Sequence, residues 1–457
     1  MIPAPEVIDS ALGLAARLGR CDETIVIVAD LSDASLRWAG NSMTTNGIAT
    51  SRTVSVISIV RQGDNAKLGV QSASVVDAGA LVDLVKASQD AAQCAPFSAD
   101  ATGLLCGSGE PADFSDPVPE TAVEVFTELA GQLSAGFGGA DRLYGFAHHT
   151  VETVVLGTST GLRRRFVQPA GSLEINAKRG DASAWAGVST PWFRDVPAEA
   201  MLADLDLRLG WAGHRLDLPP GRYETLMPPS TVADMLIYLG WSMDGRGAQE
   251  GRTALSAPGG GTRVGERLSH LPLTLYSDPR APGLECAPFV HTTTSTERIS
   301  VYDNGMDIGR VDWIRDGVIN ALMYPRPAAD AFGAVPTAPA DNLMMTGGSA
   351  GLAQMIADTE RGLLLTTLWY IRTVDPATLL LTGLTRDGVY LIEDGRVRAS
   401  VNNFRFNESP LDLLRRATEA GIPERTLPRE CGDWVTRAVM PTLRIPDFHM
   451  SSVSQAR

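Results

Sequence analysis

Apolar and polar residues alternate along much of the first 190 residues, as they do in half-buried strands. The clearest stretch is "TVSVISIV" at 53–60. Alternation of this kind places apolar side chains on one face of an antiparallel sheet. We expect strands over residues 23–30, 36–40, 53–62 and 67–74, and further strands between residues 141 and 190.

Helical patterns separate these groups of strands. Apolar residues at helical spacing predict helices over residues 5–19, 77–94, 119–134 and 197–213. Asp77 is a suitable N-cap for the second of them. Residues 95–118 are rich in Pro, Gly and Ser and predict a long loop. Helices that lie apart from antiparallel strands indicate an α+β domain, which we place at residues 1–195.

The second half of the chain has a β-rich pattern, and we place a C-terminal domain at residues 196–457. In "YLIEDGRVRASV" (390–401), Asp394 and Gly395 suit a type I′ hairpin turn. The segment "SPLDLLRRATEAG" (409–421) predicts a helix that is capped by Ser409 and ended by Gly421. Further strands are expected over residues 309–324, 361–372 and 388–406.

Charge and composition exclude several classes of function. The chain of 457 residues carries 39 basic and 53 acidic residues, a formal charge of −14, which opposes binding to nucleic acids and anionic membranes. No apolar run reaches the length of a membrane span. The first 21 residues are typical of an amphipathic helix rather than a signal peptide. The five cysteines are scattered and form no CxxC pair, so we expect a cytoplasmic protein without a disulfide framework.

Few residues outside one helix suggest chemistry. His148 and His149 are adjacent in a predicted strand and should point to opposite faces, so they cannot easily share a metal. The segment 291–305 mixes His, Glu and Asp without metal-ligand spacing. "GGSAG" (347–351) lacks the context of a phosphate loop or a hydrolase nucleophile. Residues Arg163–Arg165 form either a solvated face or a contact with acidic groups of a peptide or partner.

Three segments together resemble the TldD/PmbA family of zinc-peptidase assemblies. The most specific is the run "IADTERGLLLTTLWYIRT…LIEDGRVRASVNNFRFNESPLDLL" within residues 356–414, and segments 36–60 and 151–177 resemble earlier parts of the family pattern. The resemblance implies an α+β N-terminal domain and a β-rich C-terminal domain, in chains that pair around an internal cavity. It also implies a role in cleaving unfolded or modified small peptides.

The helix that follows "MPP" at 227–229 indicates which subunit of such an assembly this chain resembles. In the family's catalytic subunit this helix carries an HExxxH motif, whose histidines bind zinc and whose Glu acts as general base. Aligned on the two prolines, those three positions fall at about Ile237, Tyr238 and Ser242, none of which can replace His or Glu. "CGDW" (431–434) resembles the family's Cys ligand, which makes Cys431 a candidate vestigial ligand. The resemblance therefore implies the non-catalytic, TldE/PmbA-like subunit, with no catalytic or metal-binding residues of its own.

Such a subunit would pair with an HExxxH-bearing, TldD-like chain, as a heterodimer or a higher assembly. Zinc would lie in that partner, and an unfolded peptide would be the substrate. Trp369 and Tyr370 either belong to a core strand or line a strand edge that accepts the peptide as an added strand. Two alternatives stay open: a stand-alone peptide-binding or scaffold protein without peptidase activity, and an enzyme that uses Cys431 as a nucleophile.

Overall fold

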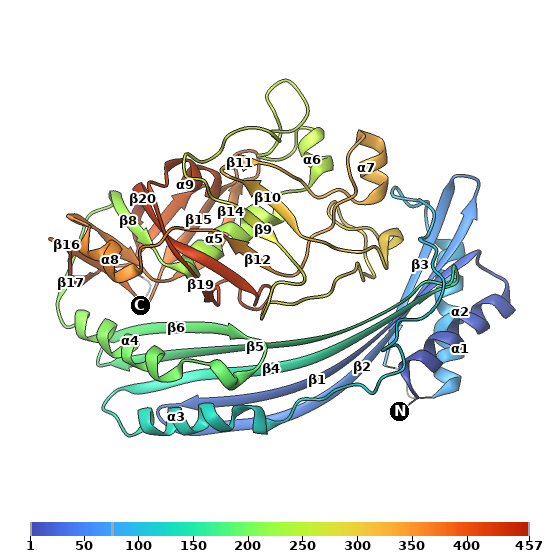
Figure 1. The fold of residues 1–457 in the computed structure, drawn as a ribbon, viewed down its shortest axis with the longest axis horizontal. Helices are drawn as coiled ribbons and strands as arrows, with labels where there is room; N and C mark the ends of the chain where they lie inside the picture. Colours follow the sequence, from blue (N-terminus) through green and yellow to red (C-terminus); the bar gives the residue numbers. More distant parts are fainter. Residues whose placement is uncertain (1, 75–76, 456–457) are drawn as a thin grey trace.

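The computed structural model describes residues 2–74 and 77–455, and its first layer is a curved sheet (Figure 1). The strand order is β3-β2-β1-β4-β5-β6, and every neighbouring pair is antiparallel. Its strands are β1 Glu23–Ala39, β2 Met43–Gln62, β3 Asn65–Ala73, β4 Arg142–Thr158, β5 Arg163–Arg179 and β6 Ala182–Thr190. The two short strands expected at 23–30 and 36–40 are one strand, because buried and less buried positions continue to alternate through "LSDAS".

Helices cover one face of this sheet, at its two ends (Figure 1). They are α1 Ala4–Leu18, α2 Ala78–Cys94, α3 Thr127–Phe137 and α4 Ala198–Trp211, with 3-10 turns η1 Val123–Phe126 and η2 Phe193–Asp195. The predicted cap of α2 is confirmed, since Asp77 accepts the N–H of Ala80 at 2.8 Å. The helix expected at 119–134 begins later, because the N–H of Thr121 donates to Ser32 Oγ and keeps this part extended.

The predicted domain division at residue 195 stays a prediction. Helix α4 lies beyond that point, yet Met201, Leu205 and Leu209 pack in the hydrophobic core beneath the first sheet. The antiparallel sheet with segregated helices confirms the α+β character expected for this half.

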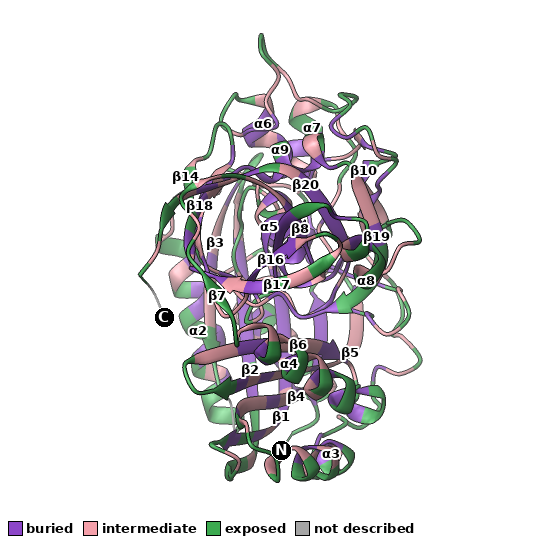
Figure 2. Cartoon of the chain, turned by 90° about the vertical axis from the view of Figure 1, so that its left-hand side faces the viewer, coloured by how far each residue is buried: buried purple, intermediate pink, exposed green. Residues whose placement is uncertain are grey.

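The second layer is a large mixed sheet that curves around helix α5 (Pro229–Trp241); Figure 2 shows buried residues gathered there. The pairs β8·β13, β12·β20 and β7·β17 are parallel, and the other pairs are antiparallel. The strands are β7 Arg215–Leu216, β8 Gly221–Met227, β9 Leu275–Ser277, β10 Val311–Arg315, β11 Val318–Ile319, β12 Leu343–Met345, β13 Arg361–Leu365, β14 Leu368–Asp375, β15 Leu380–Thr385, β16 Val389–Glu393, β17 Arg396–Val401, β18 Phe404–Glu408, β19 Glu419–Thr426 and β20 Ala438–Val453. The short helices are α6 Gly245–Gln249, η3 Val301–Asp303, α7 Arg326–Phe332, α8 Leu352–Ala357 and α9 Pro410–Arg416.

Two local predictions in this half had different outcomes. The hairpin turn is confirmed, since Asp394 and Gly395 both have the positive φ (50° and 72°) that a type I′ turn requires. The helix expected over 409–421 is wrong beyond Arg416, because residues 419–426 pair with β20 as strand β19. Ser409 lies at the N-cap, but its hydroxyl donates to the carbonyl of Thr378 instead of capping the helix.

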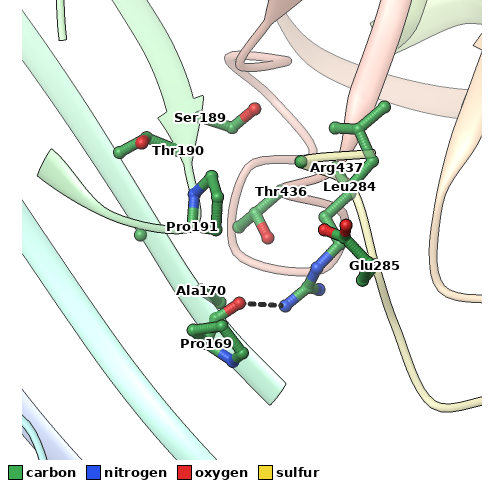
Figure 3. A pocket seen from close by; sticks show the side chains of 11 residues that line it. Pro169, Ala170, Ser189, Thr190, Pro191, Leu284, Glu285, Thr436 and Arg437 are labelled. Atoms are coloured by element: carbon green, nitrogen blue, oxygen red, sulfur yellow. Dashed lines mark hydrogen bonds between the residues drawn. The ribbon is translucent and has the colours of Figure 1, made fainter. Parts of the chain in front are cut away.

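The two layers meet where residues of β5 and β6 face the segments around Leu284 and Arg437 (Figure 3). Arg437 reaches from the C-terminal half to the carbonyl of Pro169 on β5, and its guanidinium also pairs with Asp341 at 3.0 Å. A cavity beside it has a volume of about 10 Å³, which is room for about one water molecule. Arg437 therefore links the two halves, and the cavity beside it is too small to hold a substrate. Within residues 2–74 and 77–455, no helix is both long and apolar enough to cross a membrane.

Candidate functional site

Helix α5 is a core helix. It begins at Pro229, a residue favoured at the first helical position, and it packs against β8, β19, β20 and α9. Nine of its 13 residues are buried, and they lie on all sides of the helix rather than along one stripe. A helix that is apolar all round belongs inside a protein, so α5 holds the C-terminal half together.

Asp234 is the acidic side chain of this helix, and it is fully buried. Its Oδ1 accepts the backbone N–H groups of Glu430 at 3.0 Å and Cys431 at 3.2 Å. Its Oδ2 has no hydrogen-bond partner among the described residues. Burial raises the pKa of Asp234 to about 8, although the hydrogen bonds from Cys431 and Glu430 oppose that rise. At neutral pH the carboxyl group is therefore mainly protonated, which removes the cost of a buried charge.

Tyr238 lies one helical turn after Asp234, on the same face of α5. Its hydroxyl donates to the carbonyl of Ile371 on β14 at 2.8 Å. Burial, with the nearby Cys431 and Glu430, raises the pKa of Tyr238 to about 12. Together, Asp234 and Tyr238 join α5 to strand β14 and to the segment around residue 430.

Replacing Tyr238 with Phe should cost about 1 kcal/mol of stability, the usual net value of one hydrogen bond. The ring would stay in place, but the carbonyl of Ile371 would lose its donor. Urea unfolding measures the change. Tyr144→Phe is the matched control, because the Tyr144 hydroxyl makes no hydrogen bond within the described part of the chain. Equal losses in the two variants would contradict this role of Tyr238.

Glu430 organises the facing strand. Its carboxylate accepts the N–H groups of Tyr370 at 2.9 Å and Ile371 at 3.1 Å, and it pairs with Arg372 at 3.0 Å. Strand β14 has a bulge at this point, where the pairing with β15 shifts register between Trp369 and Arg372. Tyr370 has φ 53°, a conformation that is uncommon for a residue with a side chain. The Glu430 carboxylate thus satisfies the two amides that the bulge exposes.

The structure places Trp369 and Tyr370 on a strand edge. Within the described residues, β14 pairs only with β15. The Trp369 ring lies 5.6 Å from the guanidinium groups of both Arg386 and Arg429, and Tyr370 is 53% exposed. However, the amide of Tyr370 is already bonded to Glu430. Peptide binding by Trp369 and Tyr370 stays a prediction, and an added strand would have to pair with other groups of β14 or displace Glu430.

Cys431 is fully buried beside α5. Burial, with the nearby carboxyl groups of Asp234 and Glu430, holds the pKa of its thiol above its ordinary value. A thiol in such surroundings stays protonated, whereas nucleophiles and metal ligands act as thiolates. The surroundings of Cys431 therefore favour a structural role over the reactive one left open above.

The residues at this site do not fit a zinc ion. Of the three positions aligned with HExxxH, Ile237 lies in the apolar core, Tyr238 bonds to Ile371, and the Ser242 hydroxyl donates to Leu239 at the end of α5. Zinc requires three or four ligands from Cys, His, Asp and Glu. No group of three such side chains is placed to hold a metal anywhere in residues 2–74 and 77–455.

A cleft of about 240 Å³ opens at the C-terminal end of α5. An aromatic series leads to it: the rings of Tyr238 and Trp241 are 5.2 Å apart, and those of Trp241 and Trp434 are 6.2 Å apart. The cleft is lined by Ile237, Gly240, Trp241, Ser277, Arg298, Trp313, Met323, Pro339, Ala340, Asp341, Asn342, Leu343, Trp434 and Val435.

The histidine pair behaves as expected for adjacent strand residues. His149 is buried and contacts Thr121 Oγ1 at 2.6 Å and the carbonyl of Pro191 at 2.9 Å. His148 lies on the other face of the sheet, where it pairs with Asp33. The expectation that they point to opposite faces is confirmed.

Sequence reasoning did not assign roles to Asp234 and Glu430. Asp234 and Tyr238 are four residues apart on one helix, which places them on one face, and Glu430 directly precedes Cys431. The sequence shows these spacings, but it does not show that Asp234 contacts Glu430, which lies almost 200 residues away.

Comparison with known proteins agrees with this architecture. Residues 220–452, just over half of the chain, match the family described as the PmbA/TldA metallopeptidase C-terminal domain. No curated protein matches the sequence significantly.

Three solved structures share the fold over nearly the whole chain. TldE from Thermococcus kodakarensis has a TM-score of 0.79 and 15% identity, with 97% of this chain and 99% of that chain covered. A candidate modulator of a DNA gyrase from Thermotoga maritima has a TM-score of 0.76 and 16% identity, with coverage of 97% and 99%. Another from Bacteroides thetaiotaomicron has a TM-score of 0.77 and 17% identity, with coverage of 99% and 100%. At these identities the likeness concerns the fold, and the family follows from the match over residues 220–452: the chain belongs to the PmbA/TldD metallopeptidase family.

Proposed function

We propose that this chain is the accessory, TldE-like subunit of a TldD/TldE-type zinc metallopeptidase. In this proposal a separate, HExxxH-bearing chain holds the zinc and the hydrolytic water. The present chain completes the assembly in the cytoplasm and helps to bind an unfolded or modified small peptide.

The observation that carries the proposal is the composition of helix α5. Its single acidic group, Asp234, is buried and accepts two backbone N–H groups, and the helix contains no histidine. A general base has to reach a substrate or its water, and a zinc ligand has to present a free lone pair to the metal. The side chains of α5 instead serve the internal packing of the fold. Supporting this, the overall fold is similar to that of TldE from T. kodakarensis.

The test is to co-express the tagged chain with the HExxxH homologue of its own genome and to assay the purified assembly on an unfolded peptide. We expect the two chains to co-purify in a fixed ratio. Substituting the partner's HExxxH glutamate should abolish cleavage, whereas Cys431→Ser in the present chain should leave it within about twofold.

Two results would count against the proposal. If the two chains do not associate, the alternative of a stand-alone peptide-binding or scaffold protein is favoured. If Cys431→Ser removes activity while the assembly stays intact, the chemistry would depend on this chain.

A further inference from the structure

The cleft at the end of α5 is an apolar site with one charge that has no partner. Its walls include three tryptophans, Trp241, Trp313 and Trp434, and the last is 66% exposed. Arg298 contributes a guanidinium group from the loop before η3. That guanidinium makes no hydrogen bond and no ion pair with any residue that the structure describes.

The other polar side chains of the cleft already have partners. Asp341 pairs with Arg437 at 3.0 Å. The Asn342 amide donates to the carbonyls of Asp278 and Leu284, and Ser277 Oγ accepts from Trp313 Nε1 at 2.9 Å. The unpaired groups are therefore donors: the Arg298 guanidinium and the indole N–H groups of Trp241 and Trp434. A ligand that complements them must present acceptor oxygens with negative charge beside an apolar body.

The surroundings of Arg298 strengthen this requirement. Burial lowers the pKa of Arg298, and Asp244 acts in the opposite direction from beyond ion-pair distance. Asp244 itself accepts the N–H of Gly247 at 2.6 Å and so caps α6. A partly buried cation without a close partner gains more from a bound carboxylate than an exposed one does, because less water competes for it.

On the basis of the proposed function, we infer that this cleft binds the C-terminal residue of a peptide: its carboxylate on Arg298 and its large apolar side chain among Trp241, Trp313 and Trp434. The volume of about 240 Å³ lies below the usual range of roughly 300–1,000 Å³ for whole small-molecule sites, so it suits a terminal residue. Charge complementarity favours a terminal carboxylate over a neutral segment. The site would hold a peptide end while the partner subunit cleaves elsewhere along the chain.

Calorimetric titration of the full-length chain tests the inference directly. The probes are N-acetyl-Ala-Ala-Phe with a free carboxylate, the same peptide as its C-terminal amide, and an amidated peptide with one internal Glu. We expect saturable binding of the acid. Both amidated peptides should bind at least about tenfold more weakly than the acid, since a charge-assisted hydrogen bond is lost.

Two variants locate the site. Arg298→Gln should reduce binding of the acid to the level of the amide. Arg252→Gln is the matched control, because Arg252 is exposed, lies outside the cleft and pairs with Glu250 and Glu297. It should bind the acid as the unaltered chain does. Thermal melts of both variants exclude loss of folding, and the acid–amide comparison on the unaltered chain needs no variant at all.

Several results would overturn the inference. Equal binding of acid and amide would remove the role of the carboxylate, and equal binding of the internal-Glu peptide would remove the preference for a chain end. No saturable binding of the acid, or equal losses in Arg298→Gln and Arg252→Gln, would remove the site. Arg298→Gln should still co-purify with the HExxxH partner, so failure of this inference is separable from failure of the proposed function.

Discussion

Asp234→Asn should make the stability of the chain much less dependent on pH between about 4 and 8. In the unfolded chain Asp234 has an ordinary pKa near 4, whereas in the folded chain burial raises that pKa to about 8. The folded state therefore binds more protons in this interval, and stability falls as pH rises. The contribution is fully present below pH 4 and is lost as pH rises through 8. The expected slope from this one group is on the order of 1.4 kcal/mol per pH unit.

Asparagine suits this test because it keeps an acceptor at Oδ1 for the N–H groups of Glu430 and Cys431 but cannot ionise. Urea unfolding of both proteins at pH 5, 6, 7 and 8 should show the variant gaining on the unaltered chain at each step. Asp375→Asn is the control: Asp375 is partly exposed, and the hydrogen bonds that it accepts from Thr378 and Ala377 lower its pKa, so it does not titrate in this interval. Parallel curves for Asp234→Asn and the unaltered chain would contradict a neutral, buried Asp234.

Glu430→Ala should destabilise the bulge of strand β14. The amides of Tyr370 and Ile371 would lose their acceptor, and Tyr370 would be left in its uncommon backbone conformation without that support. The amide of Tyr370 is exposed and that of Ile371 is partly buried, so each lost hydrogen bond should cost about 0.5–1.5 kcal/mol. We therefore expect a loss of about 1–3 kcal/mol in the free energy of unfolding. Hydrogen exchange should show faster exchange at Tyr370 and Ile371 under native conditions.

The control for this change is Glu393→Ala. Glu393 forms an exposed ion pair with Arg361 at 3.5 Å, and removing such a pair should change stability by less than about 1 kcal/mol. Glu430→Gln should be intermediate, because one acceptor oxygen remains. If exchange at Tyr370 and Ile371 is unchanged in Glu430→Ala, another contact maintains the bulge.

Local patterns in the sequence predicted the fold well where the period was clear. Alternation in "TVSVISIV" and the Asp394–Gly395 turn both gave the structure that is present. Prediction failed where distant pairing decided the outcome. The helical pattern of residues 409–421 continues in the sequence past Arg416, but pairing with β20 makes residues 419–426 a strand. Tertiary pairing of that kind outweighs the small differences in local propensity.

The candidate site was predictable only in part, because some of its features are local in the sequence and others depend on distant contacts. The absence of His and Glu from α5 is a property of the sequence, and the place of Cys431 beside that helix agrees with the family resemblance. The alignment on two prolines named Ile237, Tyr238 and Ser242. The structure instead brings Asp234 and Tyr238 to the segment around Glu430, since they share a helix face. The unpaired guanidinium of Arg298 depends on where a loop crosses the cleft, which no local pattern encodes.

The most direct test of the central claim measures zinc content and cleavage of an unfolded peptide for the purified chain alone and for the chain co-purified with its HExxxH homologue. We expect the chain alone to be free of stoichiometric zinc and inactive, and the assembly to carry zinc and to cleave the peptide. Stoichiometric zinc or peptide cleavage in the chain alone would contradict it, and the ligands would then have to be sought among Cys431 and the scattered histidines.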